Sequence, residues 1–285
     1  MMELEGVAGA VTAITGFDKG SGKTTFLSHA HSIARRSGPV ALFTIGVDGA
    51  QKARDSHLSP PEIQVKTGDI VMTTQSFARS SNARFEILEA VPGRSAQGSL
   101  FLGRALREGA VTLVGSDHLS VLATMIDRVR QEHWADSVLV DGAVNRITQI
   151  QALGEVNFVF TARLDRSSLT RAGGRIRNLA ALAGLPVEPE PAGDRHRIEG
   201  VLNSETLAGV PIGTTRLSIE DFTKVFLESA ELSRTLERFD ISVRRAFRLL
   251  GFAVTLRDVN RAELLQAVGP EAAGRVLFNP YEVAC

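Results

Sequence analysis

The stretch that decides the fold is Gly16-Phe17-Asp18-Lys19-Gly20-Ser21-Gly22-Lys23-Thr24-Thr25. It follows an apolar, β-branched run from Gly9 to Ile14, which predicts a short buried strand. After it, apolar residues recur at helical spacing from Phe26 to Ala34, and Ser37-Gly38-Pro39 ends that predicted helix. A second apolar run, from Val40 to Val47, predicts another strand. Strand, glycine-rich turn, helix and strand form a βαβ unit, which requires a parallel sheet.

The residue types in this stretch are those that bind phosphate. Gly20 and Gly22 give the backbone the dihedral angles and the close approach that let N–H groups converge on anionic oxygens. A helix starting at Lys23 adds its N-terminal dipole and free amides. We expect Lys23 to reach the β- and γ-phosphates of a nucleoside triphosphate, and the Thr24 hydroxyl to bind Mg²⁺. The predicted nucleotide-binding residues are Gly20, Ser21, Gly22, Lys23, Thr24 and Thr25.

Two aspartates follow predicted buried strands and are candidates for the metal. Asp141 follows Val138-Leu139-Val140, the Walker B pattern, and Asp48 ends the earlier apolar run. The carboxyl ends of parallel strands lie where ligands bind in open α/β sheets, so both aspartates can approach the loop. Mg²⁺ usually takes one or two protein carboxylates beside the phosphates. We therefore predict that Lys23, Asp48 and Asp141 are catalytic, and that the metal lies at Thr24, Asp48 and Asp141. The alternative is that each aspartate caps the helix or turn that follows it.

Residues 60 to 95 break the alternation of strands and helices. Glu62–Lys66 and Ile70–Thr74 flank Thr67-Gly68-Asp69, a pattern that predicts a β-hairpin. Phe85–Val91 predicts a third strand before the alternation resumes. We expect this part of the chain to form a β-rich insert within the α/β domain.

The whole pattern predicts an α/β fold of the P-loop NTPase class, with a mostly parallel sheet, helices on both faces and the β-rich insert. Residues 1–195 would form the nucleotide-binding domain, because the turn-forming residues Glu188–Asp194 resemble a linker. Residues 196–285 would either complete the sheet or form a small second domain. Helices are predicted there around Asp221–Leu227 and Val243–Leu250.

Composition excludes several classes of protein. Lys and Arg total 32, as do Asp and Glu, so no net field would steer the chain to nucleic acid or to an anionic membrane. The single cysteine is Cys285, which excludes an intrachain disulfide and fits a reducing cytoplasm. The N-terminal residues lack the order of a signal peptide, and no apolar run approaches the about 18 residues that span a bilayer. We expect a cytoplasmic protein with ATP or GTP as its ligand. No Asn-Lys-x-Asp guanine motif occurs, and the sequence does not decide between adenine and guanine.

The spelling of the loop resembles that of one class of phosphate-binding proteins. The common pattern G-x-x-x-x-G-K-[ST] would place glycine at position 17, where this chain has Phe17, and the glycine stands one residue earlier at Gly16. In the same register, Gly16 to Thr24 is similar to the G-T-D-x-x-x-G-K-T loop of dethiobiotin synthetase. The class of P-loop proteins that this resemblance indicates also includes cobalamin-pathway amidotransferases and metallochaperone GTPases.

A wider resemblance is to the P-loop subunit of the reactivases of adenosylcobalamin-dependent lysine and ornithine aminomutases. The similar segments are Thr15–Thr25, Ile45–Gly49, Val65–Asp69, Phe85–Glu89, Val111–Gly115, Val138–Arg146, Asp221–Phe226 and Asn279-Pro280. The resemblance implies that NTP binding or hydrolysis opens a mutase so that damaged cobalamin leaves. It also implies that the mutase, or a second reactivase subunit, is the protein partner. Such coupling needs a switch that reads the γ-phosphate, and we expect the β-rich insert after the Asp48 strand to form the partner surface.

Two other functions stay open at this point. A small-molecule ligase or kinase resembling dethiobiotin synthetase would phosphorylate a carboxylate or carbamate in a basic pocket, for which Arg146 and Arg163 are candidates. A nucleotide-binding regulator with negligible turnover is the third possibility. Stimulation of NTP hydrolysis by a mutase would favour the first function, and dependence of hydrolysis on a small molecule would favour the second.

Overall fold

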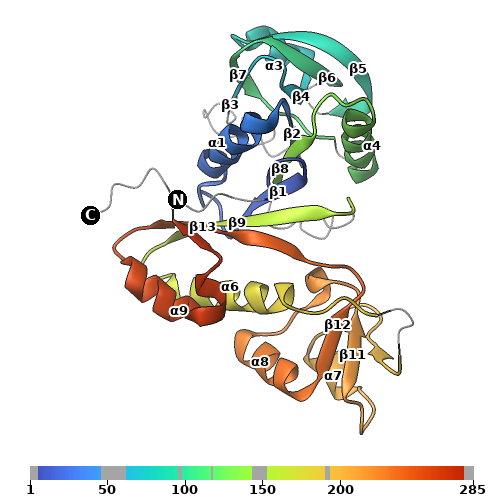
Figure 1. The fold of residues 1–285 in the computed structure, drawn as a ribbon, viewed down its shortest axis with the longest axis vertical. Coiled ribbons are helices and arrows are strands. Elements are labelled where there is room, and N and C mark those ends of the chain that lie inside the picture. Colours follow the sequence, from blue (N-terminus) through green and yellow to red (C-terminus); the bar gives the residue numbers. More distant parts are fainter. Residues whose placement is uncertain are drawn as a thin grey trace. The chain divides into compact units, whose positions relative to one another are not determined.

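The computed structural model describes residues 6–45, 62–95, 98–116, 118–142, 153–189 and 193–278. The chain divides into two compact units, unit 1 (Met1–Ala162) and unit 2 (Arg163–Cys285), which are drawn in Figure 1. Within the described ranges, no helix is long and apolar enough to cross a membrane.

The core of unit 1 is a mostly parallel β-sheet. Its strands are β1 (Val11–Gly16), β2 (Val40–Thr44), β4 (Ile70–Thr74), β5 (Arg84–Ser95), β6 (Gly98–Arg107), β8 (Ser137–Gly142) and β9 (Val156–Leu164). Their spatial order is β9-β1-β8-β2-β4-β6-β5. Pairing is parallel from β9 to β4 and antiparallel for β6 and β5. The expected α/β architecture with a mostly parallel sheet is therefore confirmed.

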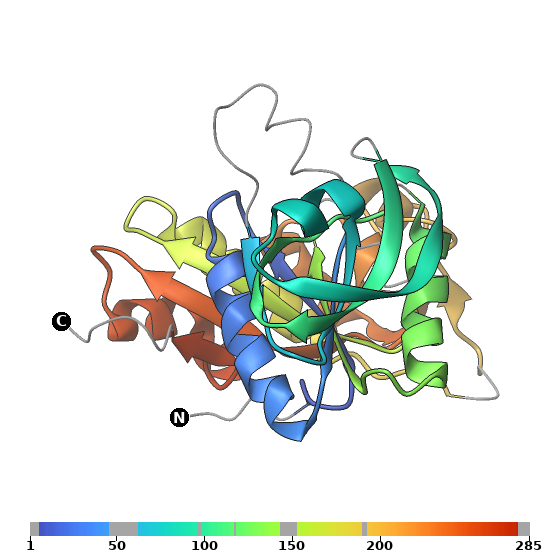
Figure 2. The same cartoon turned by 90° about the horizontal axis from the view of Figure 1, so that it is seen from above.

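Two longer helices pack on the strands of unit 1, α1 (Lys23–Ala34) and α4 (Leu119–Gln131). Helix α1 contacts β1 and β8, whereas α4 contacts β5, and the two helices lie on opposite sides of the strands (Figures 1 and 2). Their buried apolar residues are Phe26, Leu27, Ala30 and Ala34 of α1 and Leu122, Met125, Ile126 and Val129 of α4. This helical spacing forms one apolar stripe on each helix, which is why each helix packs by one face. Shorter helical segments are η1 (Arg35–Ser37) and α3 (Gln75–Ser80).

The strands β3 (Glu62–Val65) and β4 do not form the hairpin that we expected. The turn between them is present, because the Asp69 N–H donates to the Lys66 carbonyl over 3.0 Å and Gly68 has φ of +91°, as a type II turn requires. Strand β3, however, pairs with β7 (Gly109–Thr112) in a separate two-stranded sheet, while β4 lies between β2 and β6. All of β4 is buried, whereas β3 alternates between exposed and buried residues. A strand buried on both faces belongs inside a sheet, so the hairpin prediction is wrong.

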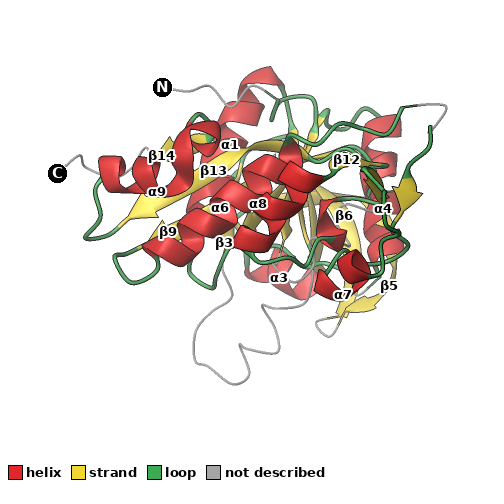
Figure 3. Ribbon diagram, turned by 90° about the horizontal axis from the view of Figure 1, so that it is seen from below, coloured by secondary structure: helices red, strands yellow, loops and turns green. Residues whose placement is uncertain are grey.

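Unit 2 has its own core of strands and helices. Its elements are α6 (Leu169–Ala183), β10 (His196–Arg197), α7 (Ser204–Ala208), β11 (Arg216–Ile219), η3 (Phe222–Lys224), α8 (Ser229–Arg238), β12 (Asp240–Val243), β13 (Arg248–Leu256), α9 (Arg261–Ala273) and β14 (Val276–Phe278). Strands β10, β11 and β12 form a parallel sheet, and β13 pairs in parallel with β14. Helix α6 packs against α8 and α9 (Figure 3). Unit 2 begins at Arg163, so it includes α6 as well as the C-terminal part of the chain.

The helix predicted over Val243–Leu250 is wrong, because β12 ends and β13 begins within that range. Buried residues of β13 include Leu249, Phe252 and Val254. This pattern is that of a strand buried on both faces, whereas a helix would bury one stripe. Around Asp221–Leu227 the structure has only the one-turn helix η3. The unexpected helix α9 contains a break at Gly269-Pro270, where Gly269 has φ of +76°, and this break conceals the helical pattern in the sequence.

Candidate functional site

The loop of residues 17–22 joins the buried strand β1 to α1, and its shape depends on two glycines. Gly20 and Gly22 have φ of +77° and +89°, in the left-handed region that glycine adopts without strain. Gly22 is also the N-cap residue of α1, and no described side chain caps this end of the helix. The N–H groups of the first turn therefore lie at the loop without a capping side chain, which is the arrangement in which helix ends bind anions.

The structure explains why the first glycine of the loop is Gly16 and does not stand at position 17. A Cβ atom at residue 16 would lie 2.0 Å from Ser21 Oγ and 3.1 Å from Lys23 Cγ, so only glycine fits where the loop folds back. Position 17 has a different environment, since the Phe17 ring is buried with its centroid 5.9 Å from that of Phe160. The shift from position 17 to Gly16 is thus a consequence of packing: residue 17 fills the core while residue 16 allows the close approach.

The structure brings Lys23 and Asp141 together, as the sequence predicted. Strand β8 lies next to β1, with Ile14 opposite Asp141. Lys23 Nζ donates to the Gly142 carbonyl over 3.3 Å and lies 3.9 Å from Asp141 Oδ1. The two side chains are 28% and 27% exposed. An ion pair at this exposure is worth at most about 1 kcal/mol, so Lys23 can exchange these partners for an incoming anion at low cost.

The remaining predicted residues occupy different environments. Thr24 and Thr25 are exposed in the first turn of α1, and Lys19 is exposed in the loop. The Ser21 side chain is buried and directed to β9, where its Oγ lies 2.9 Å from Thr161 Oγ1. Any contact of Ser21 with a phosphate would therefore come from its backbone. Two predicted residues, Asp48 and Arg146, lie outside the described residues.

The oxygen atoms around the loop suit a metal ion that is bound partly by the protein and partly by phosphate. Within the described residues no group of three or more His, Cys, Asp or Glu side chains could hold a metal ion. Mg²⁺ in nucleotide sites usually keeps several waters and takes only one or two protein ligands beside phosphate oxygens. The exposed Thr24 hydroxyl and the partly exposed Asp141 carboxylate are oxygen donors of that kind.

Two pockets in unit 2 offer weaker chemistry than the loop. They measure about 550 and 470 Å³ and are lined largely by small and apolar residues of α6, α8 and α9. Three of their charged residues already have partners: Arg177 donates to the Ala267 carbonyl, Arg275 to the Leu249 carbonyl, and Asp240 pairs with Arg195. These three charged groups are therefore already engaged within unit 2.

Two residues that the sequence did not reveal shape the site. The Gly142 carbonyl holds Lys23, and Thr161 contacts both ends of the loop, through Phe17 and Ser21. Thr161 lies within β9, and its role depends on β9 being the neighbour of β1. Local sequence patterns predict where strands begin and end, but they do not predict which strands are neighbours in the sheet.

Comparison with known proteins identifies no relative of this chain. No family model matches it, and neither a curated protein nor a solved structure matches it significantly.

Proposed function

We propose that the chain is a P-loop protein that binds ATP or GTP with Mg²⁺ at Gly16–Thr25. The observation that carries this proposal is the partly exposed pair of Lys23 and Asp141 beside the uncapped start of α1. The glycines of the loop fit such a ligand, because the backbone at Gly20 and Gly22 is free of Cβ atoms and in the left-handed region. A P-loop NTPase fold is the finer form of the α/β architecture that this site supports.

Each residue has a defined role in this proposal. Lys23 would leave the Gly142 carbonyl and donate to the β- and γ-phosphates, while backbone N–H groups from Gly20 to Thr25 bind the phosphate oxygens. The Thr24 hydroxyl and the Asp141 carboxylate would hold the metal, and bound Mg²⁺ neutralises charge on the phosphates. Asp48 remains a proposed second carboxylate on the strength of its position in the sequence.

We further propose that the protein is an NTPase that acts on a protein partner, as a reactivase of an adenosylcobalamin-dependent aminomutase. The support is the ordered sequence resemblance from Thr15 to Asn279-Pro280. The strands β3, β5, β6 and β7, all within residues 62–112, are the antiparallel part of unit 1 and the candidate partner surface. Its affinity for the mutase would have to differ between nucleotide states, since about 1.4 kcal/mol of difference shifts such an equilibrium ten-fold.

Two experiments test these proposals separately. Calorimetric titration of the full chain with ATP and with GTP, each with Mg²⁺, should show saturable binding of at least one; heat from neither would contradict the nucleotide site. Size-exclusion runs with an adenosylcobalamin-dependent aminomutase would compare a non-hydrolysable NTP, the NDP and no nucleotide. We expect association that depends on the nucleotide. Equal, negligible association in all three would contradict the reactivase proposal and favour the small-molecule ligase.

A further inference from the structure

Thr161 of β9 contacts the loop at two places, once through its backbone carbonyl and once through its side chain. Its side chain is 1% exposed, and it lies opposite Gly16 in the parallel pairing of β1 with β9. The Thr161 carbonyl accepts from the Phe17 N–H over 2.9 Å, at the start of the loop. The Thr161 hydroxyl lies 2.9 Å from Ser21 Oγ, near the end of the loop. One residue of a neighbouring strand thus holds both ends of residues 17–22.

The Thr161 hydroxyl has two neighbours within hydrogen-bonding distance. Its one proton can go to the Thr15 carbonyl, which lies 3.4 Å away, or to Ser21 Oγ, which lies 2.9 Å away. The hydrogen bond between Ser21 and Thr161 forms in both cases, with either hydroxyl as the donor. Ser21 is 4% exposed and its Oγ fills the space above Gly16, where a Cβ atom would come within 2.0 Å. Ser21 therefore has one orientation, and this orientation directs its side chain away from the exposed side of the loop.

We propose that Thr161 is a positioning residue of the phosphate-binding loop, acting through Ser21. The inference rests on the proposed nucleotide site. Gly20 and Gly22 leave the backbone on either side of Ser21 with more freedom than other residues would, and fixing such backbone on binding costs entropy. Because Thr161 holds Ser21 before any ligand arrives, this cost is not incurred when the anion binds, and a preorganised loop binds more tightly.

The chain contains a matched control for the loss of a buried threonine hydroxyl. Thr12 of β1 is fully buried like Thr161, but within the described residues its hydroxyl has no hydrogen-bond partner. Thr12→Val and Thr161→Val make the same chemical change in neighbouring strands. Only Thr161→Val removes a contact to the loop, so only that variant should affect binding beyond a change in stability.

The experiment measures the Kd for Mg²⁺-ATP and Mg²⁺-GTP by calorimetry, with thermal unfolding as a separate readout. For whichever nucleotide binds, Thr161→Val should raise Kd about five-fold, the loss expected for one neutral hydrogen bond. Thr161→Ser, which keeps the hydroxyl, should restore the wild-type Kd, and Thr12→Val should leave it unchanged. Ser21→Ala should weaken binding by the same factor as Thr161→Val, and the double variant by no more than either single one.

An unchanged Kd in Thr161→Val, with binding intact in the wild type, would overturn this inference alone. Additive losses in the double variant would overturn it as well, because the two hydroxyls would then act independently. If Thr161→Val fails to fold, Ser21→Ala decides, since it breaks the same hydrogen bond from the loop side. Absence of nucleotide binding to the wild type would instead overturn the proposed function itself.

Discussion

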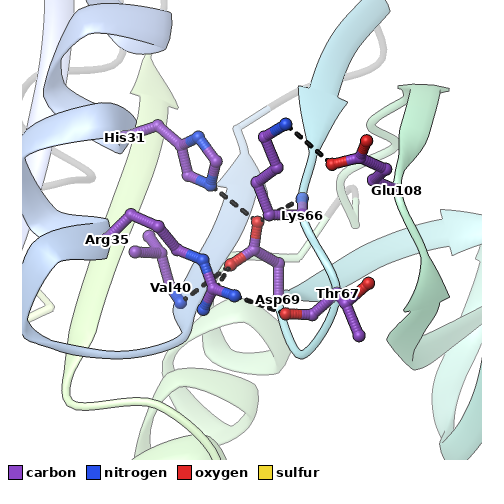
Figure 4. A network of polar contacts seen from close by, with 7 residues as sticks. All are labelled: His31, Arg35, Val40, Lys66, Thr67, Asp69 and Glu108. Atoms are coloured by element: carbon purple, nitrogen blue, oxygen red, sulfur yellow. Dashed lines mark hydrogen bonds and ion pairs between the residues drawn. The ribbon is translucent and has the colours of Figure 1, made fainter.

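An aspartate contacts each end of helix α1, and the two aspartates differ in burial and in the number of their polar partners. At the C-terminal half of α1, the Asp69 carboxylate is fully buried and each of its oxygens has two polar partners (Figure 4). Asp69 Oδ2 lies 2.7 Å from both His31 Nε2 and the Lys66 N–H nitrogen. Asp69 Oδ1 lies 3.1 Å from the Val40 nitrogen and 3.4 Å from Arg35 Nη1. At the N-terminal end, Asp141 is about a quarter exposed and its lysine partner is 3.9 Å away.

The difference separates a carboxylate that holds the fold from one that can take part in binding. Asp69 joins α1, the start of β2 and the turn before β4, so its loss would leave the buried His31 and the buried Val40 N–H without this acceptor. Asp141 and Lys23 meet at the carboxyl end of the internal strand β8, and because each side chain is about a quarter exposed, a ligand can replace either partner. The two roles are distinguished by the burial of the carboxylate and by how many polar partners its oxygens have, because the residue type is the same.

The largest effect that this comparison predicts is on stability at Asp69. Asp69→Asn should lower the free energy of unfolding by about 3 to 5 kcal/mol, because it leaves the buried His31 and the partly exposed Arg35 facing an uncharged group that also carries its own N–H donors. Chemical denaturation followed by the fluorescence of Trp134, the single tryptophan, measures this change.

The matched control for Asp69 is Glu108, which pairs with Lys66 at 2.7 Å on the surface. The hydrogen bond from Lys66 and its charge lower the pKa of Glu108, but the pair is exposed on both sides. Glu108→Gln should leave the denaturation midpoint unchanged. Equal losses of unfolding free energy in Asp69→Asn and Glu108→Gln would show that burial and the number of polar partners do not determine how much a carboxylate stabilises this fold.

A smaller effect is expected at Asp141, on binding and not on stability. Asp141→Asn should weaken Mg²⁺-dependent nucleotide binding about ten-fold, or by about 1.4 kcal/mol, and should leave the unfolding free energy within about 1 kcal/mol of wild type. Titrations with and without Mg²⁺ provide the measurement. If the variant kept its full Mg²⁺ dependence, Asp48 would become the better candidate for the metal.

The smallest effect concerns a third carboxylate, Asp165, which is half-buried and hydrogen-bonded. Bonds from the Ser167 hydroxyl, and then from the hydroxyl and N–H of Ser168, lower the pKa of Asp165 from 3.8 to about 2. Because the folded pKa is depressed, the stabilisation is present above pH 3.8 and disappears as pH falls towards 2. An NMR titration of the Asp165 carboxyl should give this pKa, and Ser167→Ala should raise it; the same value in both proteins would contradict the assigned cause.

The sequence predicted those parts of the site that depend on local pattern. Glycine and lysine spacing identified the loop, and a buried strand that ends in a carboxylate identified Asp141. The Asp69 network and the Thr161 contacts were not predicted, because both depend on which segments are neighbours in space. The β3–β4 hairpin failed for the same reason: Gly68 specifies the turn, but burial decides the partner of each strand.

The most direct test of the central claim compares Lys19 of the loop with Lys23, the first residue of α1. Lys23 lies beside Asp141 at the start of α1, whereas Lys19 is an exposed residue of the preceding turn. Calorimetric titration with ATP and GTP in the presence of Mg²⁺ should show no detectable binding to Lys23→Ala and wild-type affinity in Lys19→Ala, with both variants folded. Wild-type affinity in Lys23→Ala would contradict the assignment of the nucleotide site to this loop.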